Sequence, residues 1–61
     1  MRYELQITTD NGRVSASIID TENQGRIVED CARGTWSIAQ FSKLRQFDMC
    51  VEMLNDWNCK S

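Results

Sequence analysis

The side chains best suited to covalent chemistry in this sequence are three cysteines, Cys31, Cys50 and Cys59. A thiol attacks a substrate or binds a metal once it is deprotonated, and a neighbouring histidine commonly helps it to do so. The chain contains no histidine, so the usual base at neutral pH is missing. Three widely spaced cysteines also make a poor zinc site. We therefore expect structural cysteines, no cofactor, no metal and no enzymatic activity.

A row of carboxylates offers a second kind of chemistry. Asp48, Glu52 and Asp56 are spaced by four residues, which places them along one edge of a helix. They could bind a divalent cation, meet a basic protein partner or simply face solvent. A hard cation generally takes six or more oxygen ligands from a curved loop, which a straight helix does not provide. The sequence therefore favours a solvated edge or a basic partner over a metal.

Met49, Met53 and Trp57 follow the same spacing and form a second apolar stripe beside these acids. Methionine adapts to the shape of a partner, and tryptophan is enriched where binding energy concentrates. This stripe either contacts another protein or packs internally between a hairpin and another helix. The sequence favours internal packing and leaves both interpretations open. The candidate partner interface comprises Trp36, Asp48, Met49, Glu52, Met53, Asp56 and Trp57.

The elements that position these residues begin with a hairpin. Asn11-Gly12 is a strong signal for a two-residue type I′ turn, because both residues tolerate positive φ. With this turn as the loop, one face of the hairpin is apolar and the other is largely polar, as the pleat of a half-buried sheet requires. The apolar face would carry Leu5, Ile7, Val14, Ala16 and Ile18.

A first helix is predicted after the hairpin. Thr21-Glu22-Asn23-Gln24 has the form of a capping box, and Gly34 stands where a helix commonly ends. Between them, Ile27, Val28, Cys31 and Ala32 fall on one side of a helix. The alternative is a third short strand over Arg26–Cys31, which the adjacent pair Ile27 and Val28 disfavours because they interrupt the alternation.

A second helix is predicted from Ser37 to Trp57. Ser37-Ile38-Ala39-Gln40 is another capping box, and Trp36 and Phe41 occupy the two positions of a hydrophobic staple. A rival boundary would make Thr35–Gln40 a short strand and begin the helix at Ser42. In the favoured interpretation the core stripe consists of Leu44, Phe47, Val51 and Leu54.

These elements predict one small α+β domain over residues 1–61, with an N-terminal antiparallel β-hairpin packed against two α-helices (ββαα). A chain of this length buries only about 60% of its unfolded surface, which makes a homodimer an attractive way to gain stability. The second strand could pair with another copy through its edge. The candidate pairing edge comprises Val14, Ser15, Ala16, Ser17 and Ile18.

Charge and composition narrow the classes of partner. Seven basic against nine acidic residues give a net charge of −2, which argues against a protein devoted to phosphate backbones. The odd, sparse cysteine set favours a reducing cytoplasm. No apolar run approaches the length of a membrane span, and the N-terminal residues do not begin a signal peptide.

The function expected from these features is that of a small non-enzymatic protein that binds another protein, as an inhibitor or adaptor. Phage- or plasmid-encoded blockers of bacterial defence complexes are one group of such proteins. The alternative is a dimeric DNA-binding regulator that pools its basic side chains. Those side chains would be Arg13, Arg33, Lys43 and Arg45.

Overall fold

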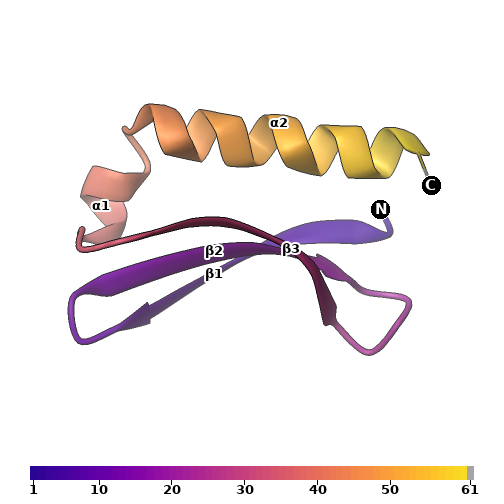
Figure 1. Cartoon of the computed structure of the whole chain (residues 1–61), viewed down its shortest axis with the longest axis horizontal. Helices are drawn as coiled ribbons and strands as arrows, with labels where there is room; N and C mark the ends of the chain where they lie inside the picture. Colours follow the sequence, from indigo (N-terminus) through magenta and orange to yellow (C-terminus); the bar gives the residue numbers. More distant parts are fainter. Residues whose placement is uncertain (61) are drawn as a thin grey trace.

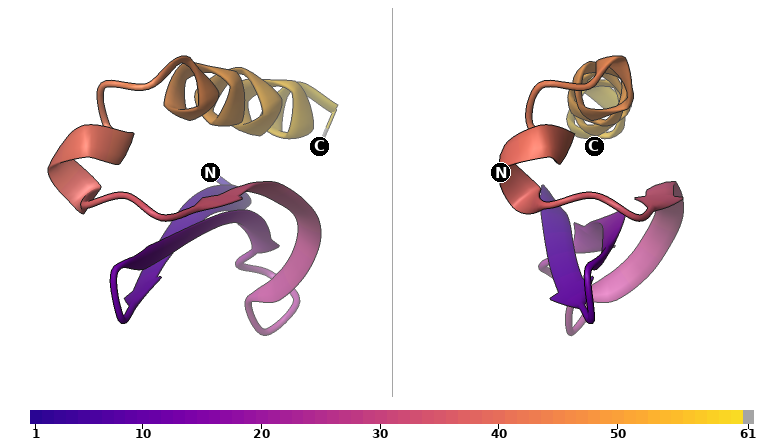
Figure 2. Two further views of the ribbon diagram at one scale, coloured as in Figure 1. Left: turned by 60° about the vertical axis from the view of Figure 1, so that its left-hand side comes forward. Right: turned by 90° about the vertical axis from the view of Figure 1, so that its left-hand side faces the viewer.

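The computed structural model describes residues 1–60, which form a three-stranded antiparallel sheet followed by two helices. Strands β1 (Tyr3–Asp10), β2 (Arg13–Asp20) and β3 (Arg26–Gly34) lie in the order β1-β2-β3. Helix α1 (Ile38–Phe41) is a single turn, and helix α2 (Arg45–Lys60) lies over one face of the sheet (Figure 1). The opposite face of the curved sheet has no helix over it (Figure 2).

The predicted hairpin is confirmed. Asn11 and Gly12 form its turn with φ values of 54° and 77°, and Asp10 pairs with Arg13. The register then places Leu5 opposite Ile18 and Ile7 opposite Ala16, as the apolar alternation predicted.

The core forms where β2 meets the helices. Val14, Ala16 and Ile18 alternate along β2 and are at most 2% exposed. Phe41 of α1 and Cys50 of α2 are buried against this strand, and apolar side chains of β1, β3 and α2 surround them. The central strand is therefore the most deeply buried element of the chain.

The prediction of a first helix after the hairpin is wrong, because Arg26–Gly34 is strand β3. Gln24 and Gly25 both have positive φ, at 60° and 71°, which ends any helix in its first turn. The Thr21 hydroxyl donates to the carbonyl of Arg2 instead of capping a helix. Two register shifts in the pairing with β2 explain why the strand resembled a helix.

Each shift adds a residue to β3, so the outward-facing positions recur every three residues rather than every two. These positions are Ile27, Asp30 and Arg33, opposite Ile19, Ser17 and Ser15 of β2. A spacing of three lies close to the helical period of 3.6. The bulged strand therefore loses the alternation of a regular strand, and Ile27, predicted on the apolar side of a helix, instead faces outward with Asp30 and Arg33.

The second predicted helix is divided into α1 and α2. Its capping box is confirmed, since the Ser37 hydroxyl accepts from the Gln40 amide and the Gln40 side chain accepts from the Ser37 amide. The staple is confirmed by Trp36 and Phe41, whose rings stack at 5.5 Å. The Ser42 hydroxyl donates to the Ala39 carbonyl, a local bond that competes with the helical backbone. The amides of Lys43 and Leu44 then donate to the carbonyls of Gln40 and Phe41, three residues earlier, and the α-helical pattern resumes in α2 at Arg45.

Strand β2 is not an open edge, which corrects the prediction that Val14–Ile18 could pair with another copy. It pairs with β1 on one side and with β3 on the other. Only β1 and β3 are edge strands. At the start of β1, the Asn58 side-chain amide accepts from the Tyr3 N–H at 3.0 Å and donates to the Tyr3 carbonyl at 3.2 Å. The Asn58 side chain thus forms with Tyr3 the two backbone hydrogen bonds that a neighbouring strand would otherwise form.

Candidate functional site

Two of the three thiols belong to the core. Cys50 is 1% exposed, and Cys31 of β3 packs beside it. Burial raises the pKa of the Cys31 thiol to about 12, with a smaller contribution from Cys50, and burial likewise raises the pKa of Cys50. Both thiols are therefore protonated at neutral pH, which disfavours nucleophilic attack and metal binding. Cys59 is exposed near the end of α2.

Trp57 packs internally between the two edge strands. Its indole Nε1 donates to the Glu29 carboxylate of β3 at 2.8 Å, and its ring lies 5.1 Å from that of Tyr3 on β1. Since β2 separates these strands, the indole lies across the central strand. The half-buried tryptophan thus packs against both edge strands, and only part of its surface remains exposed to a partner.

Trp36 also packs against the protein itself. One side of its ring stacks on Phe41, and ring atoms lie so close to Gly34 that a Cβ atom there would overlap them. Because Gly34 has no side chain, the Trp36 indole can pack directly against the backbone at this end of the sheet.

The remaining residues of the predicted interface stay outside. Met49 is 49% exposed, and Met53 is half-buried beside it. Asp48, Glu52 and Asp56 are exposed, and none forms an ion pair with another residue in the part of the chain that the structure describes. We call the set formed by Asp48, Met49, Glu52 and Asp56 the acidic edge. The structure therefore divides the predicted interface into two tryptophans that pack against the core, an acidic edge that faces solvent, and Met53, which is half-buried.

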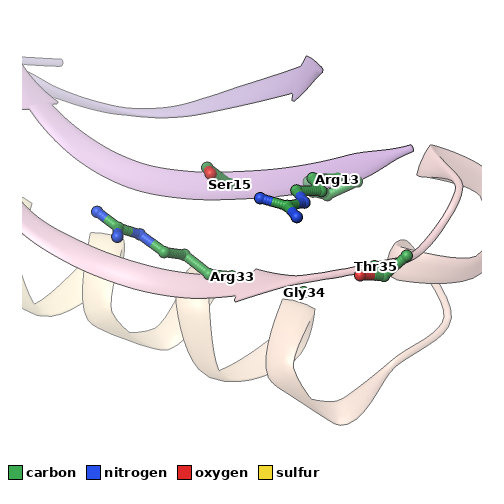
Figure 3. A pocket seen from close by; sticks show the side chains of 6 residues that line it. Arg13, Ser15, Arg33, Gly34 and Thr35 are labelled. Carbon is green, nitrogen blue, oxygen red and sulfur yellow. The ribbon is translucent and has the colours of Figure 1, made fainter. Parts of the chain in front are cut away.

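A pocket that the sequence analysis missed lies on the sheet, at the end where β2 begins and β3 ends. It has a volume of about 380 Å³ and contains two arginines, Arg13 and Arg33, from neighbouring strands (Figure 3). The sequence predicts a helix that ends near Gly34, and such a helix does not place Arg33 opposite Ser15. The complete lining comprises Arg13, Val14, Ser15, Arg33, Gly34 and Thr35.

The four basic residues considered for DNA binding come from two parts of the fold. Arg13 and Arg33 belong to the sheet, whereas Lys43 and Arg45 lie at the junction of α1 and α2. Among residues 1–60, no group of three or more histidine, cysteine or acidic side chains is arranged to hold a metal ion. No helix in the same range combines the length and the apolar character needed to cross a membrane.

Comparison with known proteins gave no match to a protein family, to a curated protein or to a solved structure. Inferences about function therefore depend on the surfaces described above.

Proposed function

We propose that this chain is a non-enzymatic binding protein, an inhibitor or adaptor, and that its acidic edge contacts a basic surface on another protein. The observation that carries this proposal is the exposure of Met49 beside a row of carboxylates that form no ion pair within residues 1–60. A single exposed apolar residue is ordinary on a protein surface. A flexible thioether beside Asp48 and Glu52 is instead suited to a partner that supplies complementary positive charge.

The two parts of this edge would serve different steps of binding. Carboxylates that face solvent attract a basic partner from a distance and speed its association. The Met49 side chain can then adapt to an apolar depression on the partner once water is excluded. Phe47, Cys50 and Trp57 attach α2 to the rest of the fold, so partner binding at the acidic edge would not require α2 to leave the core.

The setting of the cysteines supports the non-enzymatic part of the proposal. The two thiols in the core are held in their protonated form, and the sequence has no histidine to activate the third. An inhibitor or adaptor needs only a stable surface, which a chain of 61 residues can provide.

The test compares two double variants with equal changes of charge. Glu52→Lys/Asp56→Lys alters the acidic edge, and Glu4→Lys/Glu22→Lys makes the same change at exposed positions in β1 and the β2–β3 turn. Immobilised wild type is incubated with an extract of the cells that express it, and retained proteins are identified by mass spectrometry. We expect the wild type and the control to retain the same basic proteins, and the acidic-edge variant to lose them. Equal retention by both variants, or retention of nucleic acid alone, would contradict the proposal.

A further inference from the structure

We infer that the pocket between Arg13 and Arg33 binds the phosphate group of a small phosphomonoester. This inference is independent of the acidic edge, with which the pocket shares no residue. The pocket volume of about 380 Å³ lies within the range of small-molecule sites. The inference depends on the register of β2 and β3, which places the two arginines together.

The register brings both guanidinium groups to one face of the sheet. Arg33 pairs with Ser15, and Arg13 precedes Ser15 by two residues on the same strand, so Arg13 and Arg33 are diagonal neighbours. Such neighbours lie about 7–8 Å apart, which two long side chains can span to meet one anion. Figure 3 shows the two side chains on the same face, with Ser15 between their guanidinium groups in this view.

Neither arginine is neutralised inside the protein. Within residues 1–60, Arg13 forms no ion pair, and Arg33 has one distant contact of 3.7 Å with Asp30. The side chains of this pair are 74% and 59% exposed, and an exposed pair contributes at most about 1 kcal/mol. Two unneutralised cations on neighbouring strands repel each other, and an anion between them would relieve that repulsion.

The other residues that line the pocket can donate hydrogen bonds to the oxygens of a phosphate group. Arginine binds phosphate through two parallel hydrogen bonds, which fixes the orientation of the ligand. The hydroxyls of Ser15 and Thr35 add further donors at the same pocket. Gly34 lines the pocket through its backbone, and the Trp36 ring fills the space where its side chain would lie.

The surroundings favour a small ligand over a nucleic acid. In the strand register, Asp10 stands opposite Arg13, and Asp30 stands opposite Ser17, two residues beyond Ser15. Carboxylates therefore lie on both sides of the two arginines. A duplex, which carries one charge per ~1.7 Å along its axis, would meet these carboxylates as well. The net charge of −2 also opposes a long polyanion. A single phosphate group requires only the pocket itself.

The test is an NMR titration of the ¹⁵N-labelled full chain with phenyl phosphate, using benzoate and a short DNA duplex as competing probes. We expect phenyl phosphate to shift the amide signals of Ser15, Arg33 and Thr35. Arg13→Gln and Arg33→Gln should each weaken binding about tenfold, since a hydrogen bond to a charged group is typically worth about 1.5–3 kcal/mol. Arg26→Gln, an exposed arginine at the far end of β3, is the matched control and should bind as the wild type does.

The pH dependence identifies the ligand chemistry. A phosphomonoester gains its second charge near pH 6, and the chain has no histidine, the side chain that ordinarily titrates there. Binding of phenyl phosphate should therefore strengthen severalfold from pH 5 to pH 7, while benzoate should bind weakly throughout. The inference is overturned if Arg13→Gln and Arg33→Gln bind like the control, if benzoate binds equally well, or if only the duplex binds.

Discussion

The two ends of the sheet are closed by different chemistry. At the end that carries the Asn11-Gly12 turn, Trp36 stacks on Phe41, and Phe41 meets the edge of Phe47 at 5.7 Å. We call these three residues the aromatic end. At the opposite end, near the two chain termini (Figure 1), charges and hydrogen bonds hold the sheet together with the contact between the rings of Tyr3 and Trp57. This polar end consists of the pairs Arg2–Asp20, Tyr3–Asn58 and Glu29–Trp57.

The difference separates two sources of stability in one small domain. The aromatic end has no titratable side chain, so its contribution depends on shape and volume. The polar end holds a nearly buried carboxylate, Asp20, whose side chain is 5% exposed. Its contribution therefore depends on charge as well as on shape. Substitutions at the two ends should accordingly differ both in size and in response to pH.

The largest effect is expected for Phe41→Ala. Phe41 is 1% exposed at the centre of the aromatic end, and removing such a ring typically costs about 3–5 kcal/mol. A core of this size supplies only about 3–5 kcal/mol in total. The variant should therefore be largely unfolded at 25 °C, as measured by circular dichroism and urea denaturation.

Ile38→Ala provides the control for this substitution. Ile38 belongs to the same helical turn but is 54% exposed, so its loss should change the free energy of unfolding by less than about 1 kcal/mol. A folded Phe41→Ala variant as stable as Ile38→Ala would show that the aromatic end does not hold the sheet.

A smaller effect is expected for Gly34→Ala. The added methyl group would overlap the Trp36 ring, and crowding of this kind costs about 1–3 kcal/mol. In a Trp36→Leu background the crowding is absent, and Gly34→Ala should become neutral or stabilising, since alanine restricts the unfolded chain. A double-mutant cycle in urea measures this coupling. Equal destabilisation in both backgrounds would mean that Trp36 does not require the glycine.

These features also show why the sequence revealed one part of the fold and concealed another. The hairpin was predictable because its turn residues and its alternation specify the same register. Strand β3 was not, because two bulges replace alternation with a three-residue repeat, and the positive φ of Gly25 belongs to a turn rather than to a helix. A local pattern could not reveal bulges that pairing with β2 determines.

Of the two candidate sites, one could likewise be predicted from the sequence and the other could not. The acidic edge was predictable because all its members lie on one continuous helix. The pocket was not, because it joins Arg13 and Arg33 through the pairing of two strands. Likewise, the spacing of Met49 and Trp57 predicted one stripe, but only the positions of Tyr3 and Glu29 determine that Trp57 packs internally.

The response to acid distinguishes the polar end from the aromatic end. Arg2 donates two hydrogen bonds to Asp20, at 3.0 and 2.9 Å, and this contact lowers the pKa of the Asp20 carboxyl against the opposing effect of burial. A carboxylate with a lowered pKa stabilises the fold fully above its unfolded pKa of about 3.9. That stabilisation is lost as the pH falls from about 4 through the lower pKa of the folded state.

Asp20→Asn should therefore unfold at a lower temperature than the wild type at pH 7, and the difference should shrink as the pH falls below 4. Arg2 keeps contact with water, since its side chain is 42% exposed, so the variant leaves no buried unpaired cation. Melting temperatures between pH 7 and pH 2 test this, with Glu4→Gln as a control that removes an exposed carboxylate from β1. Parallel profiles for Asp20→Asn and the wild type would show that the polar end does not depend on this charge. The comparison of the two ends would then reduce to one of packing alone.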